Sequence, residues 1–497
     1  MCLVPCILCL KPSCLKKLSS QQIKLVGVLS GIVVSLFLFF VNPFSVNPNA
    51  CKALAIAGLM ITWWVAEALP MPVVALLPII LFPLLKIATL EETAAPYANP
   101  VIFLFMGGFM LGLAIEKWSL HRRIALNIVK LTGTSGDKIV LGFILATGLL
   151  SMWLSNTATT MMMFPIAVSV IHVMRENHKG EGNLSHFSLT LMLAIAYASN
   201  IGGIATIIGT PPNVAYVGYI EKKYTTGVDF VNWMMVCTPL AILLLASLYI
   251  VMVKWLFPSR IKSDYSTKQL IHDELSKLGP MSKAERRVLI IFICTAFLWI
   301  TRDIINRSQG LFKLDDTIIA IACAVALFIC PAGNETDDQV MDWADTKNMA
   351  WGILLLFGGG ISLATVLEKA GLIQQLGHWL GQFAGNGLLL VFVVAVVSIF
   401  ISEVMSNVAQ VIVFAPVVSA LAEAVHMNPL ILGIAMTLAA SCASMLPMGT
   451  PPNAIVFASG HIKLKQMTTV GFVMNIVAVI LITLFCWFVL PQIMPWK

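Results

Sequence analysis

Two short polar motifs recur inside long apolar segments of the chain, and both could bind ions. The first is a serine followed by an asparagine, at positions 155–156 and again at 406–407. The second is the string Gly-Thr-Pro-Pro-Asn, which begins at Gly209 and again at Gly449. An asparagine amide has a carbonyl oxygen that can bind a cation and an NH₂ group that can donate to an anion. One such side chain could therefore link cation binding to anion binding.

The paired prolines predict what the second motif does to a helix. Proline lacks a backbone N–H and clashes with the preceding helical turn, and it drives the residue before it out of the helical conformation. We expect breaks before Pro211 and Pro451, whose upstream carbonyls suit a hard cation such as Na⁺. The N–H groups of the downstream half-helix suit a carboxylate. Irregular backbone at membrane depth is tolerated only where protein or a water-filled cavity covers it.

Basic side chains are missing around these motifs. Neither Lys nor Arg occurs within residues 141–171, 190–220, 388–425 or 430–460. An anion bound there needs a charge from elsewhere, and bound Na⁺ can supply it, which gives a physical reason for obligate coupling. The acid nearest a serine–asparagine pair, Glu403, could orient the chain or interact with a cation, and the orienting role is favoured.

The composition places the motifs in a membrane protein. The chain is 59% hydrophobic and 11% charged, and its mean hydropathy is +0.90. Soluble globular proteins are about 25% charged, so these charges are too few for a soluble surface. Apolar runs of about 17–25 residues, the length that crosses a bilayer, recur along the chain. A β-barrel would show short alternating segments, and no stretch resembles a nucleic-acid-binding patch. We predict an all-α polytopic membrane protein.

Thirteen apolar segments are predicted. They cover residues 23–42, 53–70, 72–88, 100–117, 137–175, 188–221, 230–257, 286–302, 315–332, 349–368, 387–425, 430–460 and 467–491. Segments 137–175 and 387–425 are too long for one crossing and have polar interruptions, so we expect re-entrant helical hairpins. Basic residues favour the cytoplasmic side, and this rule places the N-terminus and the linker 258–285 inside only if 137–175 does not cross. The result is about eleven transmembrane helices plus two hairpins, with Lys497 external.

The order of the motifs divides the chain into two repeats. The two serine–asparagine pairs are 251 residues apart, and Gly209 and Gly449 are 240 apart. The first hairpin is predicted to start inside and the second outside, so the repeats have inverted topology. Inverted repeats with broken helices are typical of secondary transporters. The predicted divisions are a cytoplasmic tail (1–22), a first repeat (23–257, with broken helix 188–221), a linker (258–285) and a second repeat (286–497, with broken helix 430–460).

At these motifs the chain strongly resembles the divalent anion–sodium symporter family of sodium-coupled dicarboxylate, citrate and sulfate carriers. The resemblance covers roughly residues 20–495 and rests on the stretch Ser-Asn-Thr-Ala-Thr-Thr at 155–160, both Gly-Thr-Pro-Pro-Asn strings and residues 446–457. It implies a plasma-membrane homodimer in the lipid bilayer. It also implies that a scaffold domain supports a mobile transport domain working as an elevator.

By motif position, the resemblance implies at least two sodium sites with the substrate between them. The first sodium site would use Ser151, Ser155, Asn156 and the backbone at Gly209. The second would use Ser402, the backbone of Met405, Asn407 and Gly449. The substrate would contact Asn156, Thr157, Thr210, Asn407, Val408, Thr450 and Pro451. Val408 replaces the second threonine of the pattern in bacterial succinate carriers, so one hydrogen bond to the substrate is lost.

The expected function is sodium-coupled symport of C4-dicarboxylates such as succinate, malate and fumarate. The alternatives are a sodium-coupled sulfate or citrate carrier, or a dicarboxylate exchanger. Two symmetric hairpin tips favour a dicarboxylate over compact sulfate. A sodium–proton antiporter would need an intramembrane Asp, and a membrane enzyme a nucleophile–base pair or metal cluster. Neither pattern occurs, and the pair Cys6 and Cys9 lacks the further ligands of a zinc site.

Overall fold

The computed structural model confirms that the protein is helical. It describes residues 20–44, 46–133, 135–177, 183–224, 228–259, 261, 265–310, 312–333, 339–382 and 385–495. Within these ranges every regular element is a helix, apart from one bridge between Pro331 and Gln339. Most of the predicted tail 1–22, with Cys6 and Cys9, and also Lys497, lie outside the described residues.

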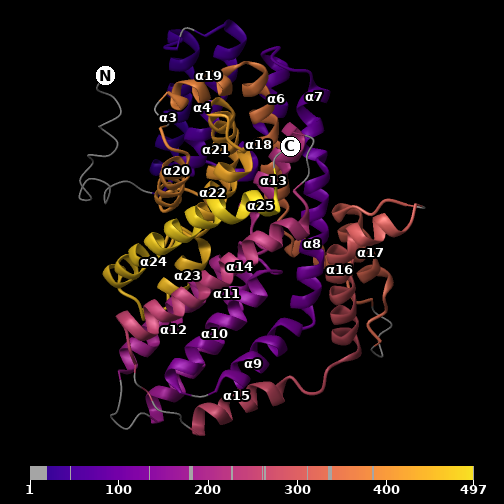
Figure 1. The fold of residues 1–497 in the computed structure, drawn as a ribbon, viewed down its shortest axis with the longest axis vertical. Helices are drawn as coiled ribbons and strands as arrows, with labels where there is room; N and C mark the ends of the chain where they lie inside the picture. The colour runs from indigo at the N-terminus through magenta and orange to yellow at the C-terminus, as the bar shows by residue number, and fades with distance from the viewer. Residues whose placement is uncertain are drawn as a thin grey trace. The chain divides into compact units, whose positions relative to one another are not determined.

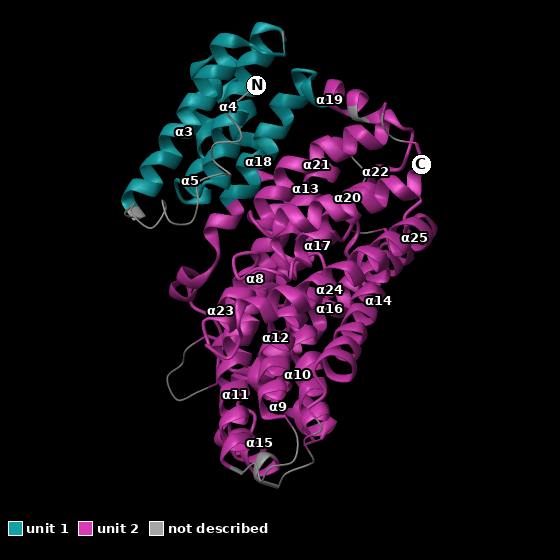
Figure 2. Ribbon diagram, turned by 90° about the vertical axis from the view of Figure 1, so that its left-hand side faces the viewer, with its two compact units in different colours: residues 1–97, 355–373 teal, residues 98–354, 374–497 magenta. Residues whose placement is uncertain are grey.

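The chain forms two compact units (Figure 2), the first from residues 1–97 and 355–373 and the second from 98–354 and 374–497. Each unit thus contains segments of both predicted repeats. The first unit contains α3 (Ser20–Val41), α4 (Pro48–Val65), α5 (Met71–Val74), α6 (Leu77–Leu84), α7 (Leu90–Ala94) and most of α18 (Trp351–Lys369). Helix α3 packs along α4, where Trp63 Nε1 donates to the Val28 carbonyl at 3.1 Å.

The second unit contains the elements that carry both motifs (Figure 1). Its helices are α8 (Pro100–Lys117), α9 (Leu120–Thr132), α10 (Gly136–Ser151), α11 (Asn156–Asn177), α12 (Leu184–Gly203), α13 (Pro211–Tyr224), α14 (Phe230–Tyr249), α15 (Tyr265–Lys277), α16 (Lys283–Ser308), α17 (Asp316–Ile329), most of α19 (Leu372–Gly381), α20 (Gly387–Ser402), α21 (Asn407–Ala424), α22 (Pro429–Ser441), α23 (Pro451–Phe457), α24 (Leu464–Leu484) and α25 (Leu490–Ile493). A π-helical segment, Ile250–Leu256, continues α14, and another, Phe485–Val489, joins α24 to α25.

Nine helical stretches in the described part of the chain are long and apolar enough to cross a membrane. They are Gln21–Val41, Leu90–Lys117, Asn156–Glu176, Leu184–Gly203, Phe230–Leu256, Lys283–Ser308, Trp351–Lys369, Asn407–Ala424 and Leu464–Ile493. Shorter apolar helices cover Met71–Leu84, Asp316–Ile329, Gly387–Ser402 and Pro429–Ser441. Twelve of the thirteen predicted apolar segments overlap one of these helices, and the remaining segment, 53–70, falls mostly on α4, which is in neither group. The chain is a multi-pass membrane protein.

Three described helices of ten or more residues, α9, α15 and α19, lie outside the predicted segments. A search for continuous apolar runs passes over helices with one charged face, and α9 carries Arg122, Arg123 and Lys130. Helices α9 and α15 pack together. Arg123 Nε donates to Glu285 Oε1 at 2.5 Å and Nη1 to the Gly279 carbonyl at 3.0 Å. The basic linker is therefore tied to an amphipathic helix.

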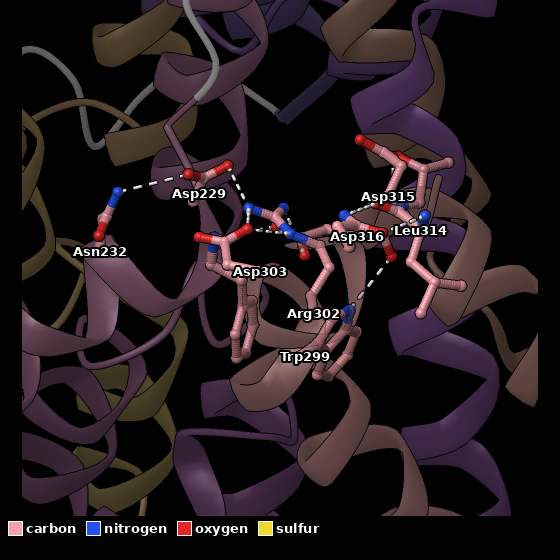
Figure 3. A network of polar contacts seen from close by, with 11 residues as sticks. Asp229, Asn232, Trp299, Arg302, Asp303, Leu314, Asp315 and Asp316 are labelled. Carbon is pink, nitrogen blue, oxygen red and sulfur yellow. Dashed lines mark hydrogen bonds and ion pairs between the residues drawn. The ribbon is translucent and has the colours of Figure 1, made fainter. Parts of the chain in front are cut away.

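A buried arginine joins three helix ends of the second unit (Figure 3). Arg302, near the end of α16, is 9% exposed. Its guanidinium lies 2.7 Å from Asp229, 2.9 Å from Asp303 and 2.9 Å from Asp316. Asp316 also accepts from the Phe230 N–H at 2.9 Å. Since removing one partner of a buried ion pair leaves a costly unpaired charge, this cluster fixes the starts of α14 and α17 against α16.

Candidate functional site

Both motifs break the helices where the sequence predicts. Helix α12 ends at Gly203 and α13 begins at Pro211, and α22 ends at Ser441 and α23 begins at Pro451. Proline suits the first helical position because its missing N–H would be unpaired there anyway. The serine–asparagine pairs lie where α10 gives way to α11 and α20 to α21.

The first repeat brings three of its predicted sodium ligands together. Ser151 Oγ donates to Asn156 Oδ1 at 2.7 Å. Asn156 Oδ1 lies so close to Gly203 that a Cβ there would come within 2.3 Å of it. A Cβ on Gly209 would come within 2.5 Å of the Gly203 carbonyl oxygen and 3.0 Å of that of Ser151. Only glycine fits at these two positions, and the oxygens of several residues converge on them.

Ser155, the fourth predicted ligand, has a local partner. Its Oγ accepts from the Ala158 N–H at 3.2 Å, which satisfies a free amide at the start of α11. A hydroxyl oxygen has two lone pairs, so this contact leaves Ser155 one acceptor position for a cation.

The second repeat is organised differently around its predicted ligands. Ser402 Oγ donates to the Ala440 carbonyl at 2.6 Å rather than to an asparagine. Among the residues that the structure describes, the half-buried Asn407 side chain forms no hydrogen bond. Met405 lies in the turn between α20 and α21. A Cβ on Gly449 would come within 2.9 Å of Glu403 Oε2.

The carboxylate of Glu403 holds the backbone just before the second Gly-Thr-Pro-Pro-Asn string. Its oxygens accept from the N–H groups of Ser444 and Met445 at 2.8 Å and of Leu446 at 2.9 Å. Asn475 Nδ2 donates to the same carboxylate at 2.8 Å. Glu403 is 3% exposed, and its contacts agree with the orienting role that the sequence favours.

Two buried threonines of the motifs contact asparagines. Asn156 Nδ2 points at Thr210 Oγ1 at 3.5 Å, and Asn200 Nδ2 donates to Thr450 Oγ1 at 2.9 Å. Asn200 belongs to α12, so it links the first broken helix to the second. Sequence reasoning missed Asn200, although an asparagine inside a continuous apolar run was a visible signal.

The remaining predicted substrate residues lie near the helix breaks with different exposure. Thr157 is half-buried in the first turn of α11, and Val408 is buried in the first turn of α21. Pro451 is exposed at the start of α23. Helix α11 packs on α23, and α13 packs on α21 and α22, so half-helices of one repeat contact elements of the other.

Comparison with known proteins gives a family and several relatives. The family model described as the sodium:sulfate symporter transmembrane region matches residues 21–493. The sodium-dependent dicarboxylate transporter SdcS of Staphylococcus saprophyticus is 39% identical over 480 residues, covering 95% of this chain and 92% of the relative. SdcS of Staphylococcus aureus is 39% identical over 478 residues with the same coverage.

Two solved structures share the fold at low sequence identity. MtrF of Neisseria gonorrhoeae, from a class of antimetabolite efflux pumps, superposes with a TM-score of 0.54 at 14% identity over 82% of this chain and 84% of its own. The YdaH transporter of Alcanivorax borkumensis gives a TM-score of 0.55 at 15% identity over 81% of this chain and 88% of its own. At such identities the likeness concerns the fold alone.

Proposed function

Because the chain belongs to the sodium:sulfate symporter family, we propose that it is a sodium-coupled symporter of C4-dicarboxylates such as succinate, malate and fumarate. It is a transporter and not an enzyme, and its place is the plasma membrane. The relatives named sodium-dependent dicarboxylate transporters support sodium as the coupling ion and dicarboxylates as the substrate class.

The arrangement of the Asn156 amide carries the proposal. Its oxygen accepts from Ser151 and lies against Gly203, among the oxygens proposed to hold the first sodium ion. Its nitrogen points the other way, to the buried Thr210, which is proposed to contact the substrate. One planar group thus places an acceptor toward the cation and a donor toward the anion, so that each ion orients the amide for the other.

A sulfate or citrate carrier and a dicarboxylate exchanger are the competing functions. The description of the family model names sodium and sulfate as the transported ions. The relatives at 39% identity are instead named as dicarboxylate transporters. We favour the dicarboxylate because the proposed substrate residues come from two separate tips, Asn156 with Thr157 and Asn407 with Val408, which suits an anion with a carboxylate at each end.

The transport cycle is proposed to follow an elevator mechanism in a homodimer, with at least two sodium sites. Helices α10 and α11 both pack on α12, and α20 and α21 both pack on α22. This packing supports two re-entrant hairpins, each with its two arms against one broken helix. The sequence predicts that the first hairpin starts inside and the second outside. Together with that prediction, the packing supports inverted repeats.

Uptake into proteoliposomes tests the function directly. With an inward Na⁺ gradient, the purified protein should accumulate labelled succinate, malate or fumarate above the external concentration. With choline in place of Na⁺, we expect accumulation to disappear. Unlabelled sulfate and citrate should compete poorly. Equal uptake in choline would contradict the coupling, and stronger competition by sulfate would contradict the substrate class.

Cysteine labelling from either side of the membrane tests the first hairpin. In a cysteine-free background, Lys130→Cys and Glu176→Cys, both exposed, lie at the two ends of the predicted hairpin. Both should react only with reagent applied to the cytoplasmic side, because the segment between them enters and leaves on that side. Lys313→Cys, after one further pair of crossings and α16, is the external control. Labelling of positions 130 and 176 from opposite sides would show a simple crossing.

A further inference from the structure

Four successive carbonyl groups at the first helix break are held by side chains. The outer two carbonyls of residues 203–206, those of Gly203 and Thr206, accept from Asn213 Nδ2 at 3.2 and 2.8 Å. The inner two accept from Trp233 Nε1 at 3.0 Å and Thr238 Oγ1 at 3.2 Å. Each of these four carbonyls already has a donor, and Asn213 supplies half of them. That freed carbonyls nearer Pro211 face the gap stays a prediction from the sequence.

The second break repeats this pattern position by position. In residues 443–446, which follow residues 203–206 by 240 positions, the outer two carbonyls accept from Asn453 Nδ2, both at 3.2 Å. The inner two accept from Tyr197 Oη at 2.7 Å and Thr468 Oγ1 at 3.4 Å. Thr238 and Thr468 lie on equivalent helices, α14 and α24, each of which follows the half-helix of its own motif. Trp233 and Tyr197 come from helices that are not equivalent, α14 and α12. The outer donor is the final asparagine of the motif both times.

Both asparagines leave their amide oxygens without a partner. Asn213 and Asn453 are 0% exposed, and within the described part of the chain neither Oδ1 has a hydrogen-bond partner. The opposite amide orientation would place this oxygen against two carbonyl oxygens, so the orientation is fixed. A buried acceptor without a donor is unfavourable, and a leucine of similar volume would avoid it. The NH₂ group is therefore what this position needs.

Each asparagine is connected, through one carbonyl group, to the glycine proposed to bind sodium in its own repeat. The Gly203 carbonyl oxygen, held by Asn213, is the atom that a Cβ on Gly209 would meet first, at 2.5 Å. The Leu446 carbonyl, held by Asn453, also accepts from the Gly449 N–H at 3.1 Å. A loss of either contact would let the backbone around the proposed cation site move.

We propose that Asn213 and Asn453 are positioning residues which hold the two helix breaks in the shape that binds sodium. Each clamps the outer carbonyls of its break and so sets the cation affinity of its own repeat. The proposal rests on the sodium coupling proposed above, but the clamping itself does not require that any ion be bound.

Asn213→Asp and Asn453→Asp test the clamp because aspartate keeps the shape and removes the donor. An ionised carboxylate would face two carbonyl oxygens. At pH 8 the Na⁺ concentration for half-maximal uptake should rise at least about tenfold, equivalent to about 1.4 kcal/mol. The substrate KM at saturating Na⁺ should change little. Toward pH 6, relative to the unmodified protein, the shift should shrink, because a protonated carboxyl can donate one hydrogen bond again.

Matched variants separate clamping from general damage. Asn428→Asp changes an asparagine that caps α22, where Oδ1 accepts from the Leu430 N–H at 2.8 Å. Aspartate caps equally well, so uptake should be unaffected. If the clamp variants do not fold, Thr238→Val and Thr468→Val remove one inner donor each without adding charge. They should raise the half-maximal Na⁺ concentration modestly, and an unchanged Na⁺ dependence would overturn the proposal.

Hydrogen–deuterium exchange distinguishes failure of the clamp from failure of the sodium coupling. In detergent without Na⁺ or substrate, backbone amides of residues 203–213 should exchange about tenfold faster in Asn213→Asp than in the unmodified protein, since local opening becomes about 1.4 kcal/mol easier. Faster exchange supports the clamp even if uptake proves independent of Na⁺. Unchanged exchange overturns it even if uptake is sodium-driven.

Discussion

Asn156→Ala is expected to abolish sodium-driven succinate uptake while the protein stays folded. The substitution removes the acceptor of Ser151 Oγ and the donor facing Thr210. Asn156 is half-buried, and the loss of such hydrogen bonds costs only about 1–3 kcal/mol of stability. Detergent-solubilised protein should therefore elute as a single species, whereas initial uptake rates should fall to the level of empty liposomes.

Thermodynamic reciprocity decides whether the amide couples the two ions or binds only one. If Na⁺ raises the affinity for succinate, succinate must raise the affinity for Na⁺ by the same factor. Equilibrium binding should show both factors falling together in Asn156→Ala and in Asn407→Ala. Asn232→Ala, outside the breaks, is the control. A variant that binds succinate weakly but keeps the full effect of Na⁺ would show that the amide contacts only the anion.

The helix breaks could be predicted from the sequence because their cause is local. Proline acts on the residue before it and on the preceding turn, so Pro211 and Pro451 mark the starts of α13 and α23 wherever the rest of the chain lies. The five-residue string recurs with its final asparagine at the same position, Asn213 and Asn453, so the sequence also predicts that both breaks are built alike. The same reasoning could not identify the inner carbonyl donors, Trp233 and Tyr197, because nothing local connects them to the breaks.

The ion cluster at Arg302 shows the other limit of sequence reasoning. Its partners Asp229, Asp303 and Asp316 lie near the ends of apolar segments, where charged residues usually face water. Whether such residues form a buried network depends on how three helix ends meet in space. Amphipathic α9 was missed for a related reason. Only one of its faces is apolar, so its sequence contains no continuous apolar run.

The two breaks differ most at one pair of equivalent positions. Met152 follows Ser151 in the first repeat, and Glu403 follows Ser402 in the second. At the first break the Met152 carbonyl accepts from Thr206 Oγ1. At the second, the Glu403 carboxylate accepts from three backbone N–H groups. The second break is therefore organised by an ionic acceptor, which has no counterpart in the first.

Glu403→Gln should disable the second proposed sodium site and leave the first intact. Among the described residues, every hydrogen-bond partner of the carboxylate is a donor, including Asn475 Nδ2. A glutamine keeps one acceptor oxygen but turns its NH₂ group toward N–H groups, so at least one buried donor loses its partner, at about 1–3 kcal/mol. We expect uptake to fall about 100-fold or more, because moving residues 444–446 displaces Gly449 and Thr450 and about 3 kcal/mol corresponds to that factor.

Sodium binding identifies which site is lost in this variant. The Hill coefficient for Na⁺ in equilibrium binding should fall toward one, since only the first site remains ordered. Glu423→Gln, in α21 and more exposed, changes a glutamate that pairs with Lys223 at 3.0 Å and should keep both the uptake rate and the Hill coefficient. An unchanged Hill coefficient with reduced uptake in Glu403→Gln would place the effect of Glu403 on the substrate or on the moving step. In that case Asn213 and Asn453 would position the backbone for sodium at both breaks. Glu403 would position the second break for a different ligand.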